Sequence, residues 1–220
     1  MKKTLIELKA IHKSFGKVGI LGGIDFIATA GTTTAITGNS GEGKTTLLSI
    51  MGLLQKPTSG SILIDGKDAA NNGIAELSKI RAARIGYLFQ APRLVGSLTA
   101  LENTLVCTAL AGKSNMRKKA VTLLASLGMS KRLDYKPEQL SIGQMRRVAL
   151  ARALVMETDI LLADEPTNDL DLALSQIVTS SLFQAGANGT AVVIVTHDRS
   201  LAAKTDCEYN LADGILHHVR

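Results

Sequence analysis

Residues 38 to 45 have the pattern of a phosphate-binding loop, in which a glycine and four free positions precede glycine, lysine and a hydroxyl residue. Such a loop turns backbone N–H groups and a helix N-terminus toward one anion. We expect Lys44 to reach the β- and γ-phosphates of a nucleotide, and the Thr45 hydroxyl to bind Mg²⁺. The residues expected to contact the nucleotide here are Gly38, Asn39, Ser40, Gly41, Glu42, Gly43, Lys44, Thr45 and Thr46.

The segments on either side of this loop have the character that the pattern requires. Residues 33 to 37 are short and rich in β-branched side chains, which predicts a strand. Residues 44 to 54 are mostly apolar and predict a buried helix that Pro57 helps to end. A glycine-rich turn that matches by chance is the alternative, but a strand before the loop and a helix after it favour phosphate binding.

Two acidic residues end another apolar segment. Residues 159 to 166 predict a buried parallel strand with Asp164 and Glu165 at its carboxyl end, the edge at which such folds bind ligands. Asp164 is the candidate second protein ligand of Mg²⁺, and Glu165 can accept a proton from water that attacks the γ-phosphate. The alternative is that the two acidic residues form a structural cap on the next turn. This alternative is weakened because the same sequence supplies Lys44 and Thr45.

His197 stands just past a second buried strand, predicted over residues 190 to 196. At that edge it can hold the γ-phosphate or position the attacking water. A single histidine at a strand end is more often structural, so only the other parts of the site give this one a function.

A second anion site is predicted at the start of a later helix. Ser141 as N-cap and Gly143 in the first turn would present a hydroxyl and free backbone N–H groups, and Gln144 completes a capping-box spacing. This site lies far along the chain from the phosphate loop. We therefore expect it to serve a nucleotide that a second molecule binds.

The elements that must position these residues predict an α/β fold of the P-loop NTPase type. Residues 5 to 15 and 20 to 28 predict an antiparallel β-layer, and residues 208 to 219 a hairpin that turns at Asp213 and Gly214. A stretch with helical periodicity and capping-box spacings separates the strands around the site. The expected parts of the single domain are a nucleotide-binding core, residues 1 to 90 and 158 to 220, and a helical lobe, residues 91 to 157.

Composition fits one large domain. The 220 residues are 45% hydrophobic, which is enough for a full core, but no run of about eighteen residues is apolar throughout. The N-terminus has no signal-peptide pattern, and the isolated Cys107 and Cys207 predict buried free thiols, so we expect a cytoplasmic protein. A net charge of +6 is compatible with nucleic acid, an anionic membrane surface or plain solubility.

Across essentially its whole length, the chain resembles the ATP-binding subunit of an ABC transporter. On residue chemistry alone Phe15 is more readily a core residue than a partner for adenine, but the family's motif order places it at the adenine-stacking position. Residues 162 to 167, 98 to 103 and 195 to 198 are similar to the macrolide-exporter and lipoprotein-releasing type, in which a short ATPase pairs with a separate permease. The other matching motifs are Walker A at 38 to 45, the Q-loop at Gln90, the signature at 140 to 144, Walker B at Asp164 and Glu165, the D-loop at 168 to 171 and the switch histidine at His197.

The resemblance implies a mechanism that uses ATP and Mg²⁺. Two copies would face head to tail, with each ATP between the Walker A loop of one and Ser141, Gly143 and Gln144 of the other. Glu165, His197 and Gln90 would act as the catalytic residues at the γ-phosphate, and Thr45, Gln90 and Asp164 would hold the metal. The other implied partner is an integral membrane permease, contacted near Arg93, Leu94 and Ser97, which would hold this chain peripherally on the inner face of the cell membrane. No direct contact with nucleic acid is expected.

Three residues depart from the family pattern. Ile142 stands where the signature usually has glycine, Glu42 adds negative charge inside the phosphate loop, and Asp169 replaces a small or amide residue in the D-loop. These departures predict slow or partner-dependent hydrolysis.

Two other classes of function remain open at this point. Residues 145 to 154 and 168 to 171 also resemble the ribosome-binding ABC proteins. Those proteins carry two cassettes and a long charged linker, and chromosome-maintenance relatives carry coiled coils, so transport is favoured. A mechanotransmitting ATPase that regulates a membrane partner has the same sequence features as a transport ATPase.

Overall fold

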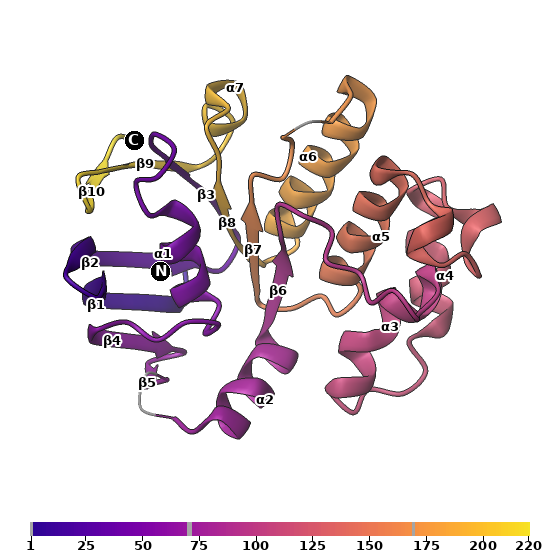
Figure 1. Ribbon diagram of the computed structural model, residues 1–220, viewed down its shortest axis with the longest axis horizontal. Coiled ribbons are helices and arrows are strands. Elements are labelled where there is room, and N and C mark those ends of the chain that lie inside the picture. Colours follow the sequence, from indigo (N-terminus) through magenta and orange to yellow (C-terminus); the bar gives the residue numbers. More distant parts are fainter. Residues whose placement is uncertain (1, 70–71, 169) are drawn as a thin grey trace.

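A computed structural model describes residues 2–69, 72–168 and 170–220. A small antiparallel sheet, a larger mixed sheet and a group of helices follow one another across the molecule (Figure 1). The expected α/β architecture with an N-terminal antiparallel layer is confirmed.

The larger sheet carries the ends of the strands that the sequence marks as functional. Its strand order is β10-β9-β3-β8-β7-β6, parallel from β9 to β6, with β10 antiparallel at the edge. Every residue of β7 and β8 is buried, which explains their continuous apolar sequences. The strands are β3 (Thr32–Thr37), β6 (Ile85–Leu88), β7 (Ile160–Asp164), β8 (Ala191–Val195), β9 (Cys207–Ala212) and β10 (Ile215–His218).

The smaller sheet packs on the helix that follows the phosphate loop. This helix, α1 (Lys44–Met51), buries Leu47, Leu48, Ile50 and Met51 completely between the two sheets. Removing such side chains from water is the main stabilising contribution to this layer. The strands of the smaller sheet, in order, are β2 (Val18–Thr29), β1 (Thr4–Phe15), β4 (Ser59–Ile64) and β5 (Lys67–Asp68).

The helical part shares a second hydrophobic cluster with one face of the larger sheet. α3, α4 and α5 lie together on the far side of the larger sheet from the antiparallel layer (Figure 1). Both predicted capping boxes are present, Thr99 with Glu102 and Ser141 with Gln144. The remaining elements are α3 (Ala100–Leu110), α4 (Arg117–Ser126), η1 (Ser130–Arg132), η2 (Pro137–Gln139), α5 (Ile142–Leu154), α6 (Leu172–Ala187) and α7 (Arg199–Ala202).

The structure differs from the sequence expectations at several places. α2 (Ile74–Arg84) was not expected, because it buries only Leu77 and so has no apolar stripe. α1 ends at Met51 instead of reaching residue 54, since Gly52 forms its C-cap. Both cysteines are half-buried, not buried as expected.

Within the described residues, none of the helices combines the length and the hydropathy needed to cross a bilayer. This agrees with the absence of a long apolar run in the sequence.

Candidate functional site

The phosphate loop joins β3 to α1 in a conformation that its glycines permit. Gly38, Gly41 and Gly43 have φ angles of 145°, 87° and 93°. A Cβ on Gly38 would lie 2.4 Å from the carbonyl oxygen of Leu211, and one on Gly43 would lie 2.7 Å from a methyl group of Ile20. The loop is therefore packed against β9 on one side and β2 on the other.

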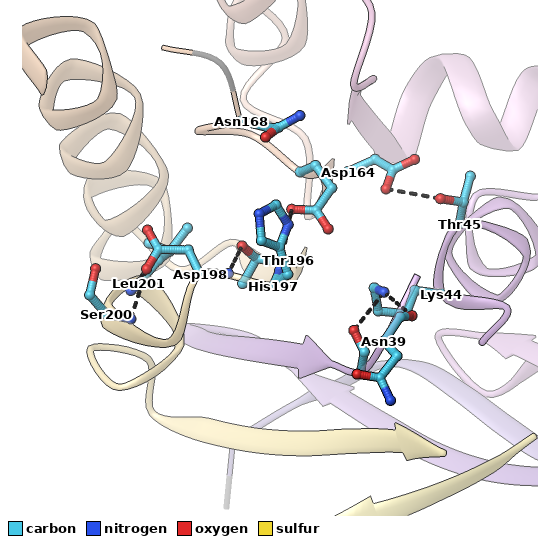
Figure 2. A network of polar contacts seen from close by, with 12 residues as sticks. Asn39, Lys44, Thr45, Asp164, Asn168, Thr196, His197, Asp198, Ser200 and Leu201 are labelled. Carbon is cyan, nitrogen blue, oxygen red and sulfur yellow. Dashed lines mark hydrogen bonds and ion pairs between the residues drawn. The ribbon is translucent and has the colours of Figure 1, made fainter. Parts of the chain in front are cut away.

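Lys44 crosses the loop from the first position of α1. Its Nζ donates to the carbonyl oxygens of Gly38, at 2.8 Å, and Asn39, at 2.7 Å (Figure 2). Gly43 is the N-cap of α1, and no side chain of the described residues caps it. The N–H groups at this helix start and a buried ammonium thus face the same space, which is an arrangement suited to an anion.

Thr45 and Asp164, the residues expected to bind Mg²⁺, bring two side-chain oxygens together at the start of α1. Thr45 Oγ1 donates to Asp164 Oδ1 at 3.2 Å (Figure 2). Neighbouring ligands of an octahedral Mg²⁺ with bonds near 2.1 Å lie about 3 Å apart, so this pair fits that ion. Burial raises the pKa of the Asp164 carboxyl above its usual value, against the effects of the Thr45 hydrogen bond and the Lys44 charge.

Glu165 and His197 are joined at the ends of neighbouring strands. Glu165 Oε2 lies 2.8 Å from His197 Nδ1 and accepts from the His197 backbone N–H at 3.3 Å. Glu165 has a φ of 45°, a left-handed conformation that is strained for a glutamate, and its N–H donates to Val195 at 2.9 Å. The carboxylate is thus held at the edge of the sheet by contacts with the end of β8 and with His197.

These side chains share one cavity of about 1000 Å³. Lys44, Gln90, Glu165 and His197 all line it. Gln90 also lines an adjoining cavity of about 500 Å³ with Thr45 and Asp164. The structure therefore brings together the phosphate-loop, Walker B, Q-loop and switch positions that the sequence singled out.

Phe15 ends β1 at a distance along the chain from these groups. Its side chain is 51% exposed, and Lys13 Nζ lies 5.0 Å from its ring centre. The core alternative for this residue is therefore wrong, because a ring in the core would be covered. An exposed ring at a strand end can stack on a base.

Ser141, Gly143 and Gln144 lie in a different part of the molecule, at the start of α5 (Figure 1). Ser141 Oγ accepts from the Gln144 N–H at 3.3 Å, and Gln144 Oε1 accepts from the Ser141 N–H at 3.0 Å. Ile142, between them, is 66% exposed. The start of α5, where the sequence predicts a second anion site, is thus exposed at the surface.

One oxygen of the Glu42 carboxylate has a partner outside the phosphate loop, and the other has a partner within it. Oε2 accepts from the Asp213 backbone N–H at 2.9 Å, and Oε1 accepts from Asn39 Nδ2 at 3.3 Å. Glu42 also lines a separate hollow of about 650 Å³ with residues 19 to 22. Because the carboxylate is oriented toward these partners, we expect its negative charge to act less strongly on the phosphates. Asp169, the third departure from the family pattern, lies outside the described residues.

One partly buried contact near the site has no signal in the sequence. Arg152, in the last turn of α5, donates to the carbonyl oxygens of Pro92 and Arg93, each at 2.8 Å. Burial lowers the pKa of its guanidinium, with a small opposing effect of Cys107. Arg152 ties the helix that begins at the second anion site to the segment that follows Gln90.

The geometry agrees with comparisons to known proteins. The model of the family described as ABC transporter matches residues 21–168. The lipoprotein-releasing system ATP-binding protein LolD of Porphyromonas gingivalis is 41% identical over 96% of this chain and 98% of its own length. The macrolide export ATP-binding/permease protein MacB of a Shewanella species (strain ANA-3) is 40% identical over 98% of this chain, which spans only 34% of that protein.

A solved structure matches the whole fold. The ATP-binding cassette MJ0796, in a dimeric post-hydrolysis state bound to ADP and phosphate, superposes with a TM-score of 0.91 at 34% identity. The match covers 98% of this chain and 99% of that one. On the evidence of its motifs, its fold and these relatives, the chain belongs to the ABC transporter family as an ATP-binding cassette.

Proposed function

We propose that this chain is a Mg²⁺-dependent ATPase that dimerises head to tail on ATP and drives a separate membrane permease. The observation that carries the proposal is the shared cavity of Lys44, Gln90, Glu165 and His197, with the Thr45–Asp164 pair beside it. This combination provides a phosphate grip, a metal site and a proton acceptor together. The α/β core and helical lobe act as the two parts of one ATPase domain.

ATP binds with its phosphates in the loop and its adenine against Phe15. The N–H groups of residues 38 to 46 surround the β- and γ-phosphates, and Lys44 exchanges its loop carbonyl partners for phosphate oxygens. Thr45 and Asp164 would hold Mg²⁺, and Gln90, which lines the same cavity, would be its third protein ligand. When bound, the ion would neutralise negative charge on the phosphates during transfer of the γ-phosphoryl group.

Hydrolysis then uses the residues at the strand ends. The oxygen of a water bonds to the γ-phosphorus, and the bond from that phosphorus to the bridging oxygen breaks, so that ADP leaves with the electron pair. The proton of the water goes to Glu165, whose carboxylate His197 Nδ1 holds at 2.8 Å. Gln90 and His197 position the water and the γ-phosphate.

The head-to-tail dimer follows from where the second anion site lies. Ser141 and the N–H groups after it point outward, while Ile142 is 66% exposed. A second copy that faces this chain would place its ATP against Ser141 and Gly143. The dimeric state of MJ0796, a relative with the same fold, supports this arrangement.

A groove between the core and the helical lobe suits the permease. Its volume is about 530 Å³, and its walls include Leu54, Tyr87, Phe89, Arg93 and Leu110. Phe89 stacks on Tyr87, with 4.1 Å between ring centres, and Arg93 lies over the Phe89 ring. A permease helix seated here, at the inner face of the membrane, would contact the segment that carries Gln90. The names of the LolD and MacB relatives support a transport role.

The test replaces Glu165 with Gln, which keeps the shape of the side chain but removes its basicity. We expect ATP hydrolysis to fall by about a thousandfold and an ATP-bound dimer to accumulate, measured by phosphate release and by light scattering after gel filtration. Hydrolysis at the wild-type rate would contradict the role of Glu165. Copurification from detergent-solubilised membranes separates the classes of partner, because ribosomes or DNA without a membrane protein would overturn transport.

A further inference from the structure

Glu42 is the acidic residue of the phosphate loop, and its carboxylate contacts another element of the fold. Its neighbours Gly41 and Gly43 both have positive φ angles, so the middle of the loop has little backbone stiffness of its own. The contact that Glu42 Oε2 accepts from the Asp213 N–H, at 2.9 Å, spans 171 positions of the chain. A side chain at this point can therefore decide whether the loop is held from outside.

The element that Glu42 reaches is fixed on its other side as well. Asp213 and Gly214 form the two-residue turn between β9 and β10, with φ angles of 50° and 73°. The Gly214 carbonyl oxygen accepts from the Gly22 N–H of β2 at 2.8 Å. The turn thus links β2 to the phosphate loop, and the carboxylate of Glu42 forms one half of that link.

The hairpin also contacts the start of the loop. The carbonyl oxygen of Leu211, in β9, lies so close to Gly38 that a Cβ there would be 2.4 Å away. The loop is therefore braced by the hairpin at Gly38 through packing and at Glu42 through a hydrogen bond. A hydrogen bond that involves a carboxylate is stronger than one between neutral groups.

We propose that Glu42 is a positioning residue, which ties the phosphate loop to the β9–β10 turn and so holds the loop in its nucleotide-binding form. The inference rests on the proposed nucleotide site and adds a residue that acts through the loop backbone. Asn39 supports it from within the loop, since its Nδ2 donates to Glu42 Oε1 at 3.3 Å. The alternative is a direct effect, in which the negative charge of Glu42 repels the phosphates.

The two possibilities predict opposite signs. If Glu42 holds the loop, Glu42→Ala weakens MgADP binding by about three- to tenfold, the size expected of a single hydrogen bond, and Glu42→Gln restores most of the affinity, because its amide oxygen also accepts. If Glu42 acts by repulsion, both variants bind MgADP more tightly. Titration calorimetry measures the affinity, and tighter binding by both variants would overturn the proposal.

Steady-state kinetics give a second readout. Loss of the brace affects ground state and transition state alike, so Glu42→Ala should raise the KM for MgATP by the same factor and change kcat by less than about twofold. The matched control is Glu76→Ala, which removes an exposed glutamate on α2 that forms an ion pair with Lys79 at 3.5 Å. If Glu42→Ala and the wild type had equal KM and kcat values for MgATP, the inference would be wrong.

A measurement on the unmodified chain does not depend on how the variants fold. Because coupling between two sites is reciprocal, MgADP should increase hydrogen-exchange protection in the hairpin, residues 207 to 218, as well as in the loop. Protection of the loop without the hairpin would contradict the brace. If the wild-type chain did not bind MgADP at all, both the proposed function and the role of Glu42 would be wrong. This result is distinct from binding without hairpin protection, which contradicts the role of Glu42 alone.

Discussion

Two helix starts in this chain are built to face an anion, and their surroundings differ. At the start of α1, Lys44 is buried, and side chains from several other segments line the same cavities. At the start of α5, Ser141 is exposed, and its hydroxyl and Gln144 satisfy each other in a capping box. Only the first is surrounded by the groups that phosphate chemistry requires.

The difference shows what one copy of the chain can do. The α1 site combines the proposed phosphate-binding groups, metal ligands and proton acceptor, so we expect a single chain to bind nucleotide. The α5 site has only N–H groups and a hydroxyl, so it can contribute to hydrolysis only when another molecule brings a nucleotide to it. Nucleotide affinity and turnover should therefore respond differently to changes at the two sites.

The largest effect is expected at the α1 site. Lys44→Ala removes the ammonium that lies 2.8 Å from Gly38 O and 2.7 Å from Asn39 O, where the phosphates are expected. Hydrolysis should fall by about a hundredfold or more, as when other preorganised charge-stabilising groups are removed. MgADP binding measured by calorimetry should weaken in parallel. Retained affinity with lost turnover would instead place Lys44 in catalysis alone.

A smaller effect of a different kind is expected at the α5 site. Ser141→Ala should lower ATP turnover by about tenfold, corresponding to roughly 1.4 kcal/mol, while MgADP affinity of the isolated chain stays at the wild-type value. The readouts are phosphate release and titration calorimetry.

The chain offers a matched control for this variant. Thr99→Ala removes the other capping box, at the start of α3, and should cost a similar ~1 kcal/mol of stability while leaving turnover unchanged. If both variants lost turnover equally, Ser141 would act only as a helix cap and not in the composite ATP site.

Phe15→Ala tests the outer end of the α1 site. Stacking of a ring on a base contributes about 0.5–1.5 kcal/mol beyond area, so MgADP binding should weaken by about two- to tenfold. Phe15→Tyr is the control, since it keeps the ring. If Phe15→Ala bound MgADP like the wild type, the adenine would lie elsewhere.

The smallest effect is expected from the departure at the α5 site. Ile142→Gly removes a β-branched side chain, 66% exposed, from the face that should meet the second copy. Closer approach should raise turnover by about two- to fivefold, or roughly 0.4–1 kcal/mol, with MgADP affinity unchanged. Lower turnover would show that Ile142 contributes favourable contacts at that face.

Much of the site could be predicted from sequence because its signals are local. The phosphate loop is one continuous pattern, and the capping boxes at Thr99 and Ser141 depend on residues three positions apart. Asp164 is the last residue of one buried strand and His197 follows another, and parallel strands bring their ends to one edge. The family resemblance supplied the roles that such patterns leave open, including that of Gln90.

The rest depends on contacts between distant parts of the chain. α2 has few apolar residues to bury, and Arg81 donates from it to Leu53 O at 2.9 Å while Arg84 pairs with Asp65 and Asp159. No periodicity encodes such contacts, so the helix was missed. For the same reason the sequence indicated neither the Arg152 contacts nor the link between Glu42 and the Asp213 N–H.

Complementation between two impaired variants tests most directly whether the α1 and α5 sites of different copies meet at one ATP. Glu165→Gln nearly abolishes hydrolysis at the site that contains its own phosphate loop, and Ser141→Ala slows hydrolysis at the site of the facing copy. A mixed dimer of the two therefore keeps one intact composite site. We expect an equimolar mixture to recover about a quarter of the wild-type rate, since half of the dimers are mixed and each holds one working site of two. A mixture that hydrolyses ATP only at the mean rate of the two variants would contradict the shared site.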